Sequence, residues 1–494
     1  MFDFQYLPKG NLVLEKFQAR LEHYPHKLEI FKAELTIGEK EIAVKNFSGK
    51  IDQSDFSLDA TVYNYPKWFQ EELAGNSSID WSLQSSKLKV NDLLTYNGVN
   101  YLPESWAKEV FSSLDLQGKL HLYFREGLQG ADLILHQLTG RTQLHPLKLE
   151  QFRGTVNWER DYLSIKDFGG KMGQSEFAFD LGLNLSDSLQ TKKDYFRFRA
   201  AALDLDALLG FKGFEEDTNH AEAFNIFKIP FRDMEFTADI KKLNYHYNWL
   251  EDVKGKARTT SNHFLHLDTL GLRVVQGSLG MKGYLNGSNP EEIYLHAQMR
   301  AEKLNIDKLL FKIENAGTDI MINENLKGEI SGTIEGRFLV YPDLTPIIDQ
   351  SDAKIALTVY DGSLNNFAPF LALSDFFSDR NLNRVRFDTL TNTFELKEGV
   401  LHIPRMNINS SLGFLEIAGR QSLDLDMNYE IRVPLSLVSQ VGFRRLFGNK
   451  SRNEINPDQE DAIVFRDTNR RVRFLNINMQ GRPDDFRVSL GRMR

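Results

Sequence analysis

The sequence predicts an all-β fold with a few short helices: an elongated, repeat-built, curled antiparallel sheet that forms a long hydrophobic groove. Apolar and polar residues alternate over many segments, as they do in a sheet that has one face buried and the other in water. Related segments recur at intervals of about 100 to 120 residues, which indicates a structure that extends by repetition. Phenylalanine is abundant, at 36 of 494 residues, whereas proline, which interrupts strand ladders, occurs only 14 times.

The segment Phe168–Asn184, FGGKMGQSEFAFDLGLN, shows this alternation. Its glycines and lysine suggest a phosphate-binding loop, but such a loop needs serine or threonine directly after the lysine, and here a methionine follows. The alternation is that of a strand rather than of a helix. We therefore expect four apolar side chains to face the groove, namely Phe177, Phe179, Leu181 and Leu183. The acidic residues Glu176 and Asp180 are then expected to face water.

The same pattern occurs 121 residues upstream, in Phe47–Asn64, FSGKIDQSDFSLDATVYN. Six of its residues, Gly49, Lys50, Gln53, Ser54, Phe56 and Asp59, match Gly170, Lys171, Gln174, Ser175, Phe177 and Asp180. A third copy begins at Leu250, and Phe387–Gly419 is a degenerate fourth. The segment is thus interpreted as a copy of a structural unit.

A second repeated feature is a strand that runs into a short helix. It occurs as LKVNDLL (Leu88–Leu94), LDLDALL (Leu203–Leu209) and LNIDKLL (Leu304–Leu310). The aspartate before each leucine pair, Asp206 in the second copy, is expected to cap the helix by accepting from its free N–H groups. Further short helices are predicted over 66–73, 102–114 and 367–378, and strands over Leu114–Phe124, Leu326–Val340 and 485–490.

These features divide the chain into four predicted parts. The first repeat unit covers 1–110, the second 111–215 and the third 216–325. Residues 326–494 form a C-terminal region, in which the polar stretch 448–461 is expected to be a mobile loop.

The residues predicted to line the groove are large apolar side chains on one strand face, together with two phenylalanines of the helix predicted over Phe367–Phe377. They are Phe56, Leu58, Val62, Phe177, Phe179, Leu181, Leu183, Leu279, Met281, Phe370 and Phe376. The apolar residues of that helix cover more than half of its circumference, so we expect it to plug the sheet end or, alternatively, to gate the groove or contact a membrane.

No motif in the sequence indicates catalysis or a cofactor. The net charge of −8 argues against a nucleic-acid partner, and the absence of cysteine excludes thiolate chemistry. His263 and His266, three apart on a strand, face opposite sides and cannot share a metal ion. Asp204 and Asp206 could mimic a carboxylate pair, but a solvated strand face is the preferred interpretation. Neither a membrane-spanning run nor a signal peptide is seen, and an anchor is expected upstream of this chain.

From about Leu304 to Leu490, and upstream by the logic of the repeat, the sequence resembles the AsmA-like family, relatives of TamB and of the eukaryotic bridge-like lipid transfer proteins. The resemblance rests on LDLDALL followed by LKGEISGTIEGRFLV, on DGSLNNFAPFLALSDFF, and most specifically on FDTLTNTFELKEGVLHIPRMNINSSLGFLEIAG with LDMNYEIRVPLS and FLNINMQGRPDDFRVSL. It implies a protein of the Gram-negative periplasm, anchored in the inner membrane, whose groove binds phospholipid acyl chains. The anchor helix itself is absent from this chain.

The leading hypothesis is a lipid-binding and lipid-conducting groove that supports phospholipid transport between the membranes and outer-membrane biogenesis. One alternative is a structural scaffold for outer-membrane protein assembly, with the apolar face filled by its own side chains. Another is a glycan-active β-solenoid enzyme. The leading hypothesis requires no catalytic residues, no metal and no cofactor.

Overall fold

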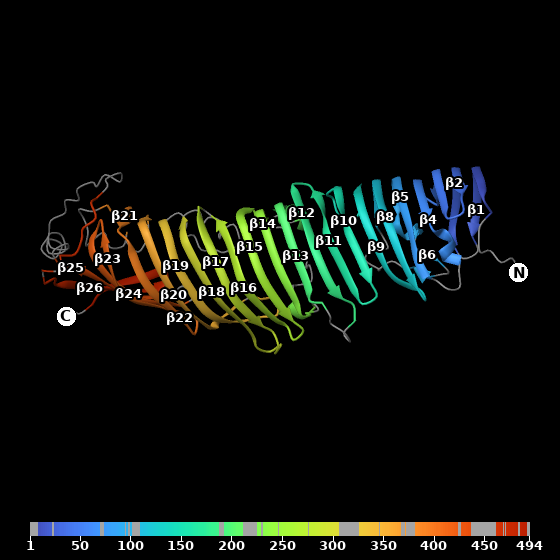
Figure 1. The fold of residues 1–494 in the computed structure, drawn as a ribbon. Coiled ribbons are helices and arrows are strands. Elements are labelled where there is room, and N and C mark those ends of the chain that lie inside the picture. The colour runs from blue at the N-terminus through green and yellow to red at the C-terminus, as the bar shows by residue number, and fades with distance from the viewer. Residues whose placement is uncertain are drawn as a thin grey trace. The chain divides into compact units, whose positions relative to one another are not determined.

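The computed structural model describes most of the chain. The described residues are 8–21, 24–69, 74–93, 95–96, 99–100, 109–186, 192–210, 225–228, 231–245, 247–274, 276–305, 326–344, 346–366, 371, 381–422, 426–435, 461–467, 469, 471–482 and 485–491. Strands dominate throughout, and helices are few and short, so the prediction of an all-β fold is confirmed (Figure 1). Among the described helices, none is long and apolar enough to cross a membrane.

Two compact units divide the chain: unit 1 is Met1–Phe211 with Met234–Tyr245, and unit 2 is Lys212–Asp233 with His246–Arg494. Twelve strands of unit 1 form a sheet in which each strand pairs with the next described large strand along the chain. They are β1 (Gly10–Leu21), β2 (Tyr24–Ile37), β3 (Glu41–Ile51), β4 (Ser54–Tyr63), β5 (Ala74–Lys89), β8 (Val110–Arg125), β9 (Leu128–Arg141), β10 (Leu149–Glu159), β11 (Tyr162–Met172), β12 (Ser175–Asn184), β13 (Asp194–Asp204) and β14 (Met234–Tyr245). A separate small pair is formed by β6 (Thr95–Tyr96) and β7 (Val99–Asn100).

All of these pairings are antiparallel except that of β13 with β14, which is parallel. A parallel pair requires the chain to return to the end of the sheet from which β13 started. The short elements of unit 1 are η1 (Tyr65–Phe69), α1 (Val90–Leu93) and α2 (Leu205–Leu209).

Unit 2 continues the same antiparallel order within itself. Its strands are β15 (Asn248–Thr260), β16 (Phe264–Val274), β17 (Gly277–Asn286), β18 (Ile293–Asn305), β19 (Leu326–Val340), β20 (Pro346–Asn365), β21 (Arg384–Phe387), β22 (Leu390–Lys397), β23 (Val400–Ser410), β24 (Gly413–Ser422), β25 (Met427–Pro434), β26 (Phe474–Arg482) and β27 (Asp485–Leu490). The long strand β20 pairs with both β21 and β22. The short helix η3 (Ile226–Lys228) also belongs to this unit.

One hairpin recurs four times with the same dimensions. A strand of 11 residues and a strand of 10 residues, two residues apart in the sequence, make up β3–β4, β11–β12, β16–β17 and β23–β24. Each first strand has a register shift directly after its fourth residue: Val44, Ile165, Leu267 and Ile403. The four copies therefore share a β-bulge as well as the lengths of their strands. Bulges bend a strand and increase its twist.

In the first two copies the bulge contains a residue with left-handed backbone, Asn46 (φ 54°) and Asp167 (φ 49°). Asparagine and aspartate adopt this conformation more readily than other residues with a side chain. The local sequence of these two copies therefore favours the bulge.

The structure differs from the predicted helices in one place. Val110–Leu114, the end of the helix predicted over 102–114, begins β8 and pairs with the end of β5. The helix predicted over 66–73 starts as the 3-10 helix η1. Most of 367–378 and of the loop predicted over 448–461 lies outside the described residues, and the four-part division of the chain stays a prediction.

Candidate functional site

The apolar face of unit 1 is the side of its sheet that carries Phe179. Phe179 pairs with Phe168 on β11 and with Phe198 on β13. Because cross-strand partners share a face, the register extends this side of the sheet strand by strand. Phe198 in turn pairs with Ala238 of β14.

Seven phenylalanine rings on this face form a connected ladder. Neighbouring rings have centroids 5.4–6.4 Å apart. The rings are Phe152, Phe168, Phe177, Phe179, Phe196, Phe198 and Phe236. Contacts of this geometry stabilise beyond the area that they bury, so the ladder is a cohesive strip across five strands.

The same side continues toward the other end of unit 1 with aliphatic side chains. On β4, Phe56 pairs with Gly49, and Leu58 pairs with Phe47. The pairs that carry the face onward from β10 to β1 are Val156–Leu133, Leu133–Leu120, Leu120–Ile79, Ile79–Val62, Val62–Ile42, Ile42–Ile37 and Leu35–Leu12. A continuous apolar surface therefore crosses all twelve strands.

The side chains of this face are mostly half-buried rather than buried. This holds for every predicted groove residue of unit 1: Phe56, Leu58, Val62, Phe177, Phe179, Leu181 and Leu183. Residues in a close-packed two-layer core would be almost wholly removed from water. The face thus retains accessible apolar area.

Unit 2 has an apolar face of the same construction. Leu279 pairs with Leu272 and Ala301, and Met281 pairs with Leu270 and Met299. Both predicted groove residues are half-buried. At one end of β16–β19, η3 packs on this face, where Ile226 joins a buried cluster with Leu285, Ile293 and Val340.

Toward the C-terminus the apolar face of unit 2 becomes a closed core, here called the C-terminal core. It consists of Leu382, Val385, Leu412, Leu415, Met427, Ile431, Val433, Ile477 and Met479. Leu412, Val433, Ile477 and Met479 are 0% exposed. Partly buried side chains that pack on it include Leu364, Leu371 and Tyr429, and burial raises the pKa of the Tyr429 phenol.

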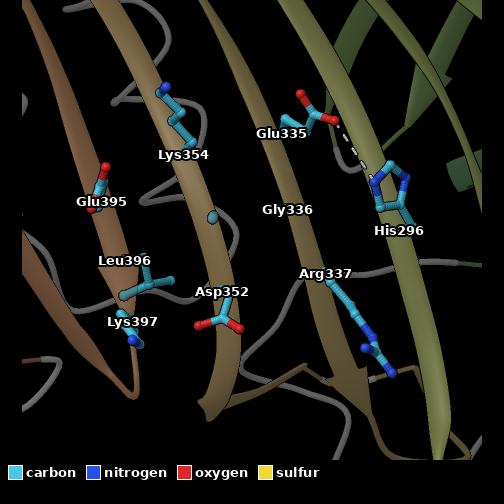
Figure 2. Close-up of a pocket in the computed structure, with 10 residues that line it drawn as sticks. His296, Glu335, Gly336, Arg337, Asp352, Lys354, Glu395, Leu396 and Lys397 are labelled. Atoms are coloured by element: carbon cyan, nitrogen blue, oxygen red, sulfur yellow. Dashed lines mark ion pairs between the residues drawn. The ribbon is translucent and has the colours of Figure 1, made fainter.

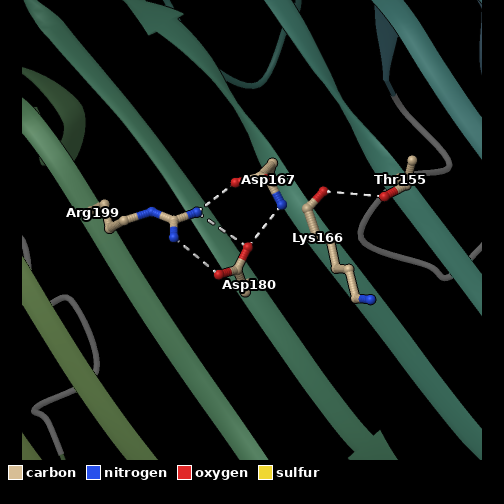
Figure 3. A network of polar contacts seen from close by, with 5 residues as sticks. All are labelled: Thr155, Lys166, Asp167, Asp180 and Arg199. Carbon is tan, nitrogen blue, oxygen red and sulfur yellow. Dashed lines mark hydrogen bonds and ion pairs between the residues drawn. The ribbon is translucent and has the colours of Figure 1, made fainter.

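The opposite face of unit 1 is polar and carries the bulge of β11. The Asp180 carboxylate accepts a hydrogen bond from the Asp167 backbone N–H (2.8 Å) and pairs with Arg199, whose guanidinium also lies 2.6 Å from the Asp167 carboxylate (Figure 3). In the first copy, Asp59 accepts in the same way from the Asn46 N–H (2.8 Å). This polar network holds the bulge in shape.

The polar face of unit 2 has a shallow concavity of about 430 Å³ (Figure 2). Its lining includes His296, Glu335, Arg337, Asp352, Lys354, Glu395 and Lys397. Lys354 pairs across strands with Glu335 and Glu395, while Glu335 lies 3.9 Å from the His296 ring. Opposite charges placed directly across strands stabilise a sheet, and this accounts for the arrangement without a ligand.

Several sequence expectations can be placed on the structure. Asp180 lies on the polar face, but its side chain is only 14% exposed because of the bulge network. Glu176, with a side chain 57% exposed, faces solvent as expected. Phe370 and Phe376 lie outside the described residues, whereas Leu371 is helical and packs on the C-terminal core.

The expectation for the aspartates of LDLDALL was wrong. Asp204, at the end of β13, caps α2 by accepting from the Ala207 N–H (3.1 Å), and Asp206 lies buried in the first turn of α2. The two carboxylates therefore do not share a strand face. His263 stacks on Phe231, with ring centroids 4.9 Å apart, and the described residues contain no group of three or more side chains that could hold a metal.

Sequence reasoning missed most of the phenylalanine ladder. Phe196 and Phe198 alternate within DYFRFRAAALD, so periodicity could have found them. Phe152 and Phe236 also alternate with other apolar residues, in FRGTVNW and MEFTADI, and the cross-strand register brings both rings to this face.

Comparisons with protein-family models, with curated proteins and with solved structures found no match to this chain.

Proposed function

We propose that the chain is a non-enzymatic lipid-binding and lipid-conducting protein of the Gram-negative periplasm. It would act in association with the inner membrane and support phospholipid transport and outer-membrane biogenesis. The observation that carries this proposal is the continuous, half-buried apolar face of each unit. The resemblance to AsmA-like proteins supports the location and the class of cargo.

The energetics of acyl chains favour such a face as a site. Moving one CH₂ group from water to an apolar surface gains about 0.8 kcal/mol, so a 16-carbon chain gains about 13 kcal/mol. A surface of phenylalanine and leucine offers this gain at every strand. A chain that slides from one strand to the next therefore exchanges equivalent contacts, and movement along the face needs no nucleotide hydrolysis.

The test is photo-crosslinking on the two sides of one strand. A benzophenone amino acid replaces Phe179 or Glu176 in the purified full chain, which is incubated with vesicles of phosphatidylethanolamine and phosphatidylglycerol. We expect phospholipid adducts at position 179 and only background at position 176. Adducts at both positions or at neither would refute the proposed site. Glu176 is the better control than Asp180, since Asp180 supports the bulge.

A charge at position 179 supplies an independent test. On an accessible face the carboxylate of Phe179→Asp stays hydrated, so the protein should remain folded and lose lipid adducts at neighbouring Phe196. In a filled core the same charge is buried without a partner and should unfold the unit. Unfolding would therefore favour the scaffold.

The scaffold for outer-membrane protein assembly is the second candidate, and the C-terminal core favours it. There the chain fills its own apolar face, as a scaffold would along its whole length. Native mass spectrometry of the full chain separates the two functions. Co-purified phospholipid supports the lipid-conducting protein, and a lipid-free mass in detergent-free buffer supports the scaffold.

A further inference from the structure

The strand β1 forms an edge of the sheet of unit 1, and among the described strands only β2 pairs with it. A free strand edge promotes association, and proteins commonly protect such edges by keeping the strand short or by placing proline in it. β1 has 12 residues and no proline, whereas β27, at the C-terminal edge of unit 2, has only 6 residues. The edge at β1 therefore offers a long row of backbone groups to a further strand.

Large apolar side chains are exposed on both faces of this edge. On the apolar face, Leu12 and Phe17 are each 45% exposed, whereas the groove residues predicted on the inner strands of unit 1 are half-buried. Val13, which follows Leu12 and therefore points to the opposite face, is 58% exposed. A further strand beside β1 would cover part of all three side chains.

The spacing of apolar residues on β1 is symmetric about the middle of the strand. Regular alternation puts residues three apart on opposite faces, but Lys16 has left-handed backbone (φ 55°) and is skipped in the register with β2. The two residues in the middle are Glu15 and Lys16. The register with β2 and β3 accordingly places four residues on the apolar face, two on each side of the middle: Leu12, Leu14, Phe17 and Ala19.

This symmetry makes β1 complementary to an antiparallel copy of itself. When Glu15 of one copy lies opposite Lys16 of the other, Leu14 lies opposite Phe17, and both faces match along the strand. The twofold axis of a dimer repeats the opposite-charge pair, and such pairs directly across strands stabilise a sheet. On its paired edge, β1 already has Glu15 opposite a lysine, Lys32 of β2. A second β1 would thus repeat a pairing that the strand makes within its own chain.

We propose that β1 is a dimer interface, at which two copies of this chain pair antiparallel through their β1 strands, with Glu15 of each copy opposite Lys16 of the other. Because the faces match in this register, the apolar faces of the two unit 1 sheets lie on the same side and join. One pair of strands is a small interface, so the association is weak and depends on concentration. The dimer itself requires no lipid and does not depend on the proposed function.

Charge reversal at these two positions tests the interface in the full chain. Lys16→Glu leaves two adjacent acidic residues in the middle of β1, and Glu15→Lys leaves two adjacent basic residues. Like charges then lie opposite each other in either homodimer, so sedimentation velocity should give a dissociation constant raised about tenfold for each variant alone. An equimolar mixture of the two variants restores both opposite-charge pairs and should form dimers as tightly as the wild type. Since Glu15→Lys also faces Lys32 within its own chain, thermal melting checks that both variants are folded.

Arg487→Glu on β27 is the matched control, because it reverses one exposed charge on another edge strand. It should leave the dimer unchanged. A wild-type chain that stays monomeric throughout a concentration series overturns the proposal, as does a dimer that both reversals on β1 leave intact. Loss of the dimer in Arg487→Glu alone would place the contact at β27 and overturn it too. These measurements contain no lipid, so lipid adducts at Phe179 report on the proposed function separately.

Disulfide formation tests the register, because the chain contains no cysteine of its own. Chains with Leu14→Cys and chains with Phe17→Cys are mixed under mild oxidation. Residues directly opposite each other have Cα atoms about 4.5–5.5 Å apart, which a disulfide can bridge. Two copies of position 14 would lie about 10 Å apart, since they are offset by three residues along the strand. We expect linked dimers in the mixture and only background in either variant alone, and equal linkage in all three samples would overturn the proposed pairing.

Discussion

The serine of the repeated hairpin has the same structural role in both of its first two copies. The Ser54 hydroxyl accepts from the Lys89 backbone N–H, and the Ser175 hydroxyl accepts from the Asp204 N–H, each at 2.9 Å. Both serines are almost completely buried. The recurrence of the serine was visible in the sequence, because it is local. Its partner lies 29 or 35 residues farther on and depends on the strand register, which no local pattern gives.

Two glycines at the same position of the repeated hairpin provide a matched test of close strand approach. A Cβ at Gly169 would lie 2.1 Å from the Phe177 carbonyl oxygen, whereas one at Gly271 would meet no atom within 4 Å. We expect Gly169→Ala to destabilise unit 1 by about 1–3 kcal/mol, because the backbone must shift. Gly271→Ala should stay within about 0.5 kcal/mol. Urea unfolding with hydrogen exchange measures both, and equal effects would contradict the geometry.

At the scale of elements, the alternation of apolar and polar residues predicted strands well, whereas apolar spacing predicted helices poorly. The strands predicted over Leu326–Val340 and 485–490 have these bounds in the structure, since long alternation leaves one choice of face. The apolar spacing of LPESWAKEVFSSL predicted a helix, but Val110–Leu114 forms strand because β5 supplies its hydrogen-bond partners. Pairing with a distant strand overrode local propensity there.

The N-cap of α2 is Asp204, whereas the sequence pattern predicted Asp206, two residues farther along the chain. The Asp204 carboxylate accepts from the Ala207 N–H (3.1 Å) and from the Asn244 side chain on β14 (2.9 Å). Asp204→Ala should lower stability by about 1 kcal/mol and speed exchange of the Ala207 amide. Asp204→Asn retains an acceptor oxygen and should change both quantities little. An Ala207 amide that exchanges equally in all three proteins would disprove the cap.

At the scale of the whole chain, stability in a repeat structure is a sum of local terms. Each strand contacts chiefly its sheet neighbours, so a mutation lowers protection around its own position first. The sequence could predict that each unit has a continuous apolar face, because alternation recurs on almost every strand. It could not predict which part of that face is closed, since the C-terminal core gathers residues from 382 to 479.

Truncation of one large side chain in the C-terminal core and of one on the apolar face of unit 1 measures how closely each of these two regions is packed. Met479→Ala opens a cavity in the C-terminal core and should cost about 2–5 kcal/mol, read from exchange of the β25–β26 amides. Phe179→Ala removes a ring that is already half-buried, so exchange in β11–β13 should report less than about half of that cost. Added phospholipid vesicles should protect the β11–β13 amides in the wild-type chain but leave those of β25–β26 unchanged. A Phe179→Ala cost as large as that of Met479→Ala, with no protection by lipid, would mean that unit 1 fills its own apolar face, and the scaffold would then be the better account of this chain.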